Sequence, residues 1–177
     1  MQGFDDIAQW RARILSRLLA IVLVLGTVAA IPSVIVVLRH GVWTVAVMDG
    51  AALAWLFVLW RLERLPYTVR VLNFLAIIYM VAICLMLKVG PVSQNYLMAP
   101  PVLAAILLGT APALAALAAS AVILVLGIGH FQSALVDMGH DPLVTALLVA
   151  LNFTCVGALL TLTCGTMLKG LSRSLDE

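Results

Sequence analysis

Six long apolar runs, separated by short polar breaks, constrain this chain more than any other feature of its sequence. The runs cover residues 18–38, 42–60, 71–87, 95–108, 113–131 and 142–168. A helix needs about 20 apolar residues to cross the roughly 30 Å hydrocarbon core of a bilayer. Because the runs lack the alternating pattern of a β-barrel, only helices satisfy their backbone in lipid. The sequence therefore predicts an all-α, polytopic membrane protein, a bundle of six transmembrane helices.

The composition supports a membrane location. Hydrophobic residues make up 64% of the 177 positions and charged residues only 10%, whereas soluble domains carry roughly 25% charged residues. The net charge is +2 and the chain has no basic stripe, which excludes a nucleic-acid-binding protein. The composition also excludes a disordered chain and a disulfide scaffold. The partner that it predicts is the lipid bilayer.

The distribution of positive charge predicts the orientation. Eight of the ten Lys and Arg residues fall on one side of the predicted spans: Arg11, Arg13, Arg17, Arg61, Arg64, Arg70, Lys169 and Arg173. Only Arg39 and Lys88 fall on the other side. The positive-inside rule then puts both termini in the cytoplasm. We expect a cytoplasmic interfacial segment over residues 1–17, the sensory bundle over 18–168, and the start of a cytoplasmic helix over 169–177.

The fourth run is short and is interrupted by Pro100-Pro101. Two consecutive prolines remove two backbone donors and leave carbonyl groups about one turn earlier without partners. We expect a kinked span, with a re-entrant segment as the alternative. Gln94, Asn95 and Tyr96 form a polar mouth to this run, which could line a cavity or simply mark a helix entry at the membrane interface.

Asp49 is the clearest ionisable residue inside a predicted span. It lies about seven residues into the second run, roughly 10 Å along a helix from its start. A charge near the bilayer centre costs at least about 2.5–3.5 kcal/mol, so Asp49 should face the bundle interior and be paired or protonated. Its role is either to contact a ligand or titrate, or to bond another helix. Gly50 beside it would permit close helix approach.

We expect Asp49 to share a ligand pocket in the outer half of the bundle with Gln94, Asn95 and Tyr96. His130, at the outer end of the fifth run, completes the candidate ligand-binding set.

Metal and cofactor signals are weak. His40, His130 and His140 all fall at non-cytoplasmic ends of spans, so a metal site or haem ligation is an alternative to an interfacial role. No metal motif links them, and the sequence requires no cofactor. Cys84, Cys155 and Cys164 lie inside predicted spans without a C-x-x-C pair, and we expect them to be small buried hydrophobic residues.

The last run predicts an output helix. Asp141-Pro142 is a helix start signal, and residues 142–168 would form about 40 Å of helix, longer than the hydrocarbon core. Leu168, Leu171 and Leu175 then follow at coiled-coil spacing. We expect the chain to be truncated from a longer protein, and a parallel homodimer to form along these leucines.

Three segments resemble a known group of proteins. Residues 65–70 read LPYTVR, residues 90–108 read GPVSQNYLMAPPVLAAILL, and residues 170–177 read GLSRSLDE. Their order resembles the N-terminal multi-span input modules of bacterial sensor histidine kinases and membrane diguanylate cyclases. Such modules usually have one proline where this chain has Pro100-Pro101, and a basic or aromatic residue is common at the position of Thr110-Ala111.

The resemblance implies a sensory domain in the bacterial inner membrane. It would detect a small or lipid-phase signal near the outer leaflet and pass a change through the sixth helix to a cytoplasmic output domain. We expect no enzyme activity within this chain, because no nucleophile–base pair or nucleotide motif is present. The alternatives are a small transporter or channel subunit that uses Asp49, and a haem- or quinone-binding redox protein that uses the histidines.

Overall fold

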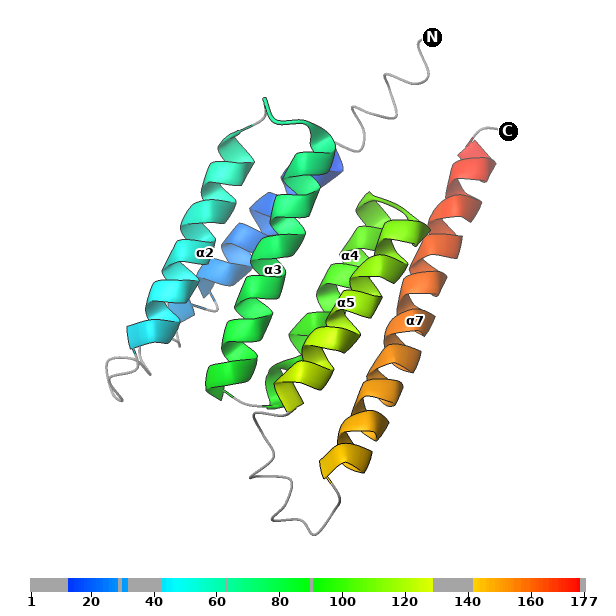
Figure 1. Ribbon diagram of the computed structural model, residues 1–177. Coiled ribbons are helices and arrows are strands. Elements are labelled where there is room, and N and C mark those ends of the chain that lie inside the picture. Colours follow the sequence, from blue (N-terminus) through cyan, green and yellow to red (C-terminus); the bar gives the residue numbers. More distant parts are fainter. Residues whose placement is uncertain are drawn as a thin grey trace. The chain divides into compact units, whose positions relative to one another are not determined.

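The computed structural model describes residues 13–28, 30–31, 43–62, 64–89, 91–128 and 142–175, and every regular element in these ranges is helical (Figure 1). A first helix covers residues 13–28. The later elements are α2 (Trp43–Arg61), α3 (Tyr67–Val89), the 3-10 helix η1 (Pro91–Met98), α4 (Ala99–Leu107), α5 (Thr110–Ile128) and α7 (Pro142–Leu175). The all-α prediction is confirmed for the described residues. His40, His130 and His140 lie outside them.

The helices follow the predicted runs closely, and the third and fourth runs differ from them in detail. The helix of the third run begins at Tyr67, so that Arg70 lies inside α3 rather than in the break before it. The fourth run is not one kinked α-helix but a change of helix type, in which η1 ends at Met98 and α4 begins at Ala99.

The chain divides into two compact units, Met1–Ile77 and Ile78–Glu177, which are described separately. The division falls within α3. The predicted domain boundaries at residues 17 and 168 stay a prediction; the first helix includes residue 13, and α7 continues to Leu175.

The first unit contains the helix over 13–28, α2 and the beginning of α3. Its buried side chains include one apolar face from each: Leu15, Leu19, Leu56, Leu59, Val71 and Phe74. A Cβ added to Gly26 would lie 3.0 Å from Leu53 Cδ2, so the first helix and α2 approach closely at this point. Figure 1 shows that consecutive helices of this unit run in opposite directions.

The second unit is built around α5. Buried side chains from the end of α3, η1, α5 and α7 form one cluster: Ala82, Met86, Leu97, Leu117, Leu124, Ala150 and Phe153. Along α5 the buried positions recur at three and four residues, at Ala113, Leu117, Ser120, Leu124 and Gly127. On α7 they recur in the same way at Ala150, Phe153, Gly157, Thr161 and Gly165. The three helices α4, α5 and α7 contact one another.

Two glycines of α7 allow this close packing. A Cβ at Gly157 would lie 2.6 Å from Leu117 Cδ1, and a Cβ at Gly165 would lie 2.7 Å from Thr110 Cγ2. Real carbon atoms do not approach so closely, so an added Cβ would require the Leu117 or Thr110 side chain to move. Gly165 is therefore level with Thr110, the first residue of α5.

A two-residue turn joins α4 to α5. The amides of Leu108 and Gly109 both donate to the Ala104 carbonyl, at 2.8 and 3.0 Å. Gly109 has a φ of 97°, the left-handed conformation that ends many helices and that side chains with a Cβ adopt reluctantly. The turn makes α4 and α5 antiparallel neighbours.

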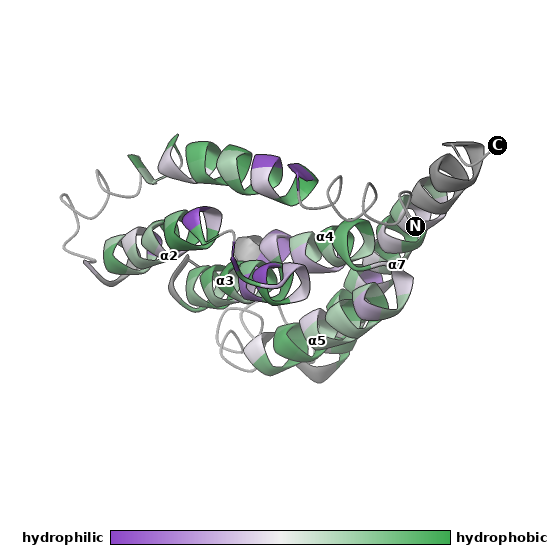
Figure 2. Cartoon of the chain, turned by 90° about the horizontal axis from the view of Figure 1, so that it is seen from above, coloured by the Kyte–Doolittle hydropathy of each residue, from purple (hydrophilic) through white to green (hydrophobic). Residues whose placement is uncertain are grey.

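Apolar residues predominate along the described helices (Figure 2), and many of their large apolar side chains are exposed. Leu126 of α5 and Met167 of α7 are each 72% exposed, as suits side chains in contact with lipid. Three described segments are long and apolar enough to cross a membrane: Tyr67–Leu87, Thr110–Gly127 and Val149–Met167. Six spans were predicted, and three helices within the described residues are long and apolar enough to cross a membrane.

Candidate functional site

The proline pair defines the most unusual backbone in the second unit. Pro100 and Pro101 are buried in the first turn of α4, where amide groups normally have no partner within the helix. The Leu97 carbonyl would accept from residue 100 in a 3-10 helix or from residue 101 in an α-helix. Both residues are prolines without an N–H, so neither helix type supplies a donor to this carbonyl.

Ser120 supplies the missing donor. Its side chain is fully buried on α5, and its hydroxyl donates to the Leu97 carbonyl oxygen at 2.9 Å. A buried carbonyl without a partner costs about 1–3 kcal/mol, so this bond explains why a serine occupies an otherwise apolar helix face. It also ties the helix break to α5.

Tyr79 extends the network to the second half of α3. Its hydroxyl donates to the Ala116 carbonyl at 2.6 Å and lies 3.0 Å from the Ser120 hydroxyl oxygen. Each hydroxyl has one proton, and two protons cannot serve three short contacts. One hydroxyl can donate to the other only when it stops donating to its own carbonyl, which is Ala116 for Tyr79 and Leu97 for Ser120.

The network therefore joins three elements but offers no spare donor. The Ala116 carbonyl also lies in the interior of α5, where the helix itself provides an amide donor, whereas the Leu97 carbonyl depends on Ser120. A ligand that accepts a hydrogen bond from Tyr79 would thus compete with the Ala116 carbonyl, which keeps its helical amide donor.

The predicted polar mouth lies on η1. Gln94 is half-buried, while Asn95 and Tyr96 are exposed, and these three side chains form no hydrogen bond with the described part of the chain. In a 3-10 helix residues three apart share a face, so Gln94 lies on the same face as Leu97. The mouth is available for a ligand or for the lipid–water interface.

Asp49 lies on α2 in the first unit, six residues after Trp43, and is half-buried. Its carboxylate forms no ion pair or hydrogen bond with the residues that the structure describes. Gly50 does not mark a close helix approach as predicted, because a Cβ there would meet no atom within 4 Å. Asp49 and the Gln94–Tyr96 mouth belong to different units, so their common pocket stays a prediction. His130 lies outside the described residues.

Two threonine hydroxyl groups of α7 bond within their own helix. Thr154 donates to the Ala150 carbonyl and Thr163 to the Leu159 carbonyl, both at 2.7 Å and both within α7. Thr161 is 1% exposed, and its hydroxyl has no hydrogen-bond partner among the described residues. The cysteines are free, but Cys155 is exposed rather than buried.

Arg70 is a site residue that the sequence did not reveal. Its side chain is 4% exposed, and one guanidinium nitrogen donates to the Leu59 carbonyl at 3.3 Å, in the last turn of α2. Helix ends leave carbonyls without amide donors, and a cation there is favourable. The Nε atom is buried without a partner in the described part of the chain.

Within the described ranges, no group of three His, Cys, Asp or Glu residues could hold a metal ion. The predicted output positions 168, 171 and 175 all lie in the continuous helix α7.

Comparison with known proteins gives one match. The family model MASE11, a membrane-associated sensory domain family, matches residues 9–171, almost the whole chain. No curated protein sequence matches the chain, and no solved structure matches it.

Proposed function

Because the chain belongs to the MASE11 family of membrane-associated sensory domains, we propose that it is the input domain of a bacterial signalling protein. In this proposal it detects a small or lipid-phase compound near the outer leaflet and passes the change through α7 to a cytoplasmic output domain. The output would be a histidine kinase or a diguanylate cyclase, and the sensory domain itself would catalyse nothing.

The length of α7 is the observation that carries this proposal. Its 34 residues make a helix of about 51 Å, well beyond the roughly 30 Å of the hydrocarbon core. The segment apolar enough to span ends at Met167. Since Gly165 is level with the start of α5, positions 168–175 extend past the α4–α5 turn as uninterrupted helix.

The packing of the second unit gives a route from the candidate mouth to α7. Gln94, Asn95 and Tyr96 lie on η1, which contacts both α4 and α5. Ser120 bonds this break directly to α5, and α5 packs on the glycine face of α7. A ligand that moved η1 would therefore disturb elements in direct contact with the proposed output helix.

We propose that all six predicted helices cross the membrane. α2 carries Trp43 at its start and Trp60 and Arg61 at its end, about 26 Å apart along the axis, as expected for interfacial anchors. The 3-10 geometry lengthens the fourth segment: eight residues of η1 and nine of α4 together rise about 30 Å. Both termini would then lie in the cytoplasm.

Helix-phase insertions test the proposal in the full-length gene product. One to seven alanines are inserted after Gly170, and autophosphorylation or cyclic-di-GMP synthesis is measured in membranes. If α7 transmits the signal, activity should vary with the roughly 100° rotation per residue and return with seven residues, which is nearly two full turns. Flexible Gly-Ser insertions of the same lengths are the matched control and should uncouple the output at every length. Activity that declines steadily with inserted length, without recovery at seven, contradicts the proposal.

A further inference from the structure

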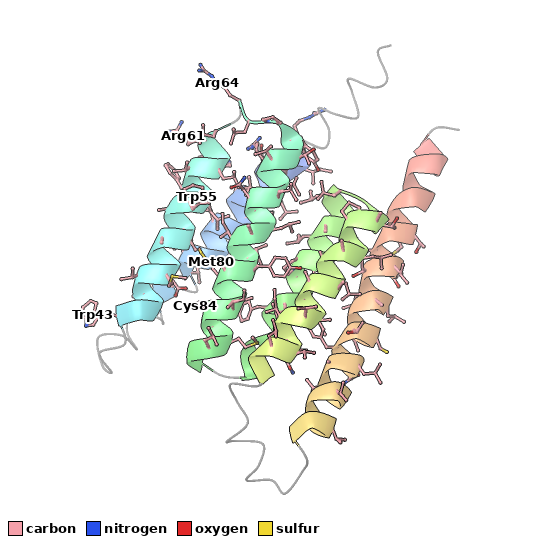
Figure 3. All side chains as sticks on the ribbon, viewed as in Figure 1. Trp43, Trp55, Arg61, Arg64, Met80 and Cys84 are labelled. Carbon is pink, nitrogen blue, oxygen red and sulfur yellow. The ribbon has the colours of Figure 1, made fainter. Side chains whose placement is uncertain are left out.

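The first unit concentrates arginine at one end. Arg13 and Arg17 lie in the first turns of the helix over 13–28, Arg61 ends α2, Arg64 lies in the following turn, and Arg70 lies in the first turn of α3. Figure 1 shows that these helix ends lie together at the same end of the unit, and Figure 3 shows Arg61 and Arg64 there, opposite Trp43. We call these five residues the arginine end.

Helix geometry puts the arginines at similar depths. The first helix and α2 touch at Gly26 and Leu53 and run antiparallel. Nine residues back from Gly26 lies Arg17, and nine residues forward from Leu53 lies Leu62, so Arg17 is level with the end of α2. Arg70 reaches the same level, because it donates to the Leu59 carbonyl.

The arginine end has no acidic partner among the residues that the structure describes. Asp49 is the single acidic residue in those ranges, and it lies twelve residues before Arg61 on α2, about 18 Å away along the axis. In the sequence, Glu63 falls between Arg61 and Arg64, so even with this carboxylate the cluster keeps a large excess of positive charge.

Two of the arginines are held in defined positions. The guanidinium carbon of Arg61 lies 6.0 Å from the Phe57 ring centroid and 5.9 Å from the Trp60 ring centroid, within the range of cation–π contacts. Arg70 is buried, with one bond to Leu59 and an Nε that has no partner in the described residues. Loose surface charges would satisfy the positive-inside rule without either arrangement.

We infer that the arginine end binds the phosphate headgroup of an anionic phospholipid. Planar guanidinium groups bind phosphate oxygens in pairs, whereas an ammonium group acts as a point charge. All five cations are arginine, and Trp60 marks the depth at which headgroups lie. Basic clusters between helices on the cytoplasmic side are suited to such headgroups. This inference does not depend on the proposed signalling role.

The test uses the full chain in nanodiscs of phosphatidylcholine with or without phosphatidylglycerol. Retained lipid is measured by native mass spectrometry and thermal unfolding is followed in parallel. Phosphatidylglycerol should be retained in preference and should raise the unfolding temperature. Arg61→Gln and Arg64→Gln should each weaken its retention by about fivefold, as a contribution of about 1 kcal/mol per arginine implies. Arg61→Lys should give a smaller loss, because the charge remains without the planar fork.

Lys88→Gln is the matched control, since it removes a cation from the other end of α3 and should leave retention unchanged. An equal loss in this variant would show that only net charge matters and would overturn the inference. So would equal retention of the two lipids. Inorganic phosphate in excess distinguishes the source of the phosphate: it should neither displace the lipid nor raise the unfolding temperature, and full replacement of the lipid by phosphate would contradict a headgroup site.

Discussion

The Ser120 hydroxyl donates a 2.9 Å hydrogen bond to the Leu97 carbonyl, the one backbone acceptor that Pro100 and Pro101 together leave without an amide donor. The serine and the prolines are about twenty residues apart in the chain, yet each explains the other. Without the prolines the carbonyl would have a helical partner, and without the serine the break would bury an unsatisfied acceptor.

Replacement of Ser120 by alanine should therefore lower the free energy of unfolding by about 1–3 kcal/mol, the cost of a buried acceptor without a donor. Pro101→Ala restores an amide that can donate to Leu97 in α-helical geometry. The cost of Ser120→Ala should consequently be smaller in the Pro101→Ala background, measured as a double-mutant cycle by denaturation in detergent micelles. Thr163→Ala is the control, because its exposed hydroxyl bonds only within α7. An equal free-energy cost of Ser120→Ala in both backgrounds would show that Ser120 does not compensate for the amide that Pro101 lacks.

Gly157→Ala and Gly165→Ala should each destabilise the second unit by about 1–3 kcal/mol, since the new methyl groups would overlap Leu117 and Thr110. Gly50→Ala is the matched control, because nothing lies within 4 Å of the added carbon. It should leave stability unchanged or raise it by up to about 1 kcal/mol. The measurement is the detergent-denaturation midpoint of each variant. A tolerated alanine at Gly157 would mean that the Leu117 side chain moves aside and that this contact does not require glycine.

Asp49→Leu should change the response of the full-length signalling protein more than it lowers the yield of folded protein. The expectation follows from a half-buried carboxylate without a described partner. If α2 spans the membrane as proposed, removal of this carboxylate relieves the cost of an ionisable group in lipid. Asp49→Asn keeps hydrogen bonding and removes the charge. Output activity and folded yield are compared for the two variants, and a loss of folding with an unchanged response would make Asp49 a structural residue.

Reporter fusions should place both termini in the cytoplasm. Fusions at Leu65 and Glu177 should report the cytoplasmic side, and fusions at His40 and Met138 the opposite side, because eight of the ten cations fall on the first side. Alkaline phosphatase and green fluorescent protein reporters give opposite signals and check each other. A reversed result at any of the four points would contradict six spans.

Cysteines at Leu171 and Leu175 should crosslink between two copies of the full-length protein in native membranes, since leucines at coiled-coil spacing bury their side chains against a partner helix. Arg173 is the control position, because helical periodicity puts it on the opposite side of α7. Equal crosslinking at Arg173, or none at any position, would exclude a dimer paired along these leucines.

The sequence predicted the helices well, because apolar runs and helix start signals act locally. Pro142 begins α7 as its Asp-Pro signal predicts, and α2 and α5 begin and end within three residues of their runs. The candidate site was harder to predict from the sequence. Ser120 and Tyr79 were not selected as candidate site residues, because their roles depend on helix rotation and on neighbours distant in sequence.

One signal for Ser120 was nevertheless present. A carbonyl followed by proline at both the third and fourth positions needs a donor from elsewhere, and Ser120 is a hydroxyl residue in the next apolar helix. The burial of Arg70 was not predicted, and Gly50 was wrongly expected to mark a close helix approach. Both features depend on where α2 and α3 lie against their neighbours, which helical periodicity within one segment does not determine.

The buried stripe of α7 has a consequence for how a pair of these domains would be built. Positions 150, 157, 161 and 165 pack inside the second unit, and positions 168, 171 and 175 continue the same side of the helix at spacings of three and four residues. Since α7 is unbroken, a dimer paired along these positions would use a continuation of the helix face that packs inside the second unit. Two such helices would contact each other beyond the α4–α5 turns of their own bundles. Rotation of α7 about its own axis would then change its packing inside the second unit and its contact with the partner helix at the same time.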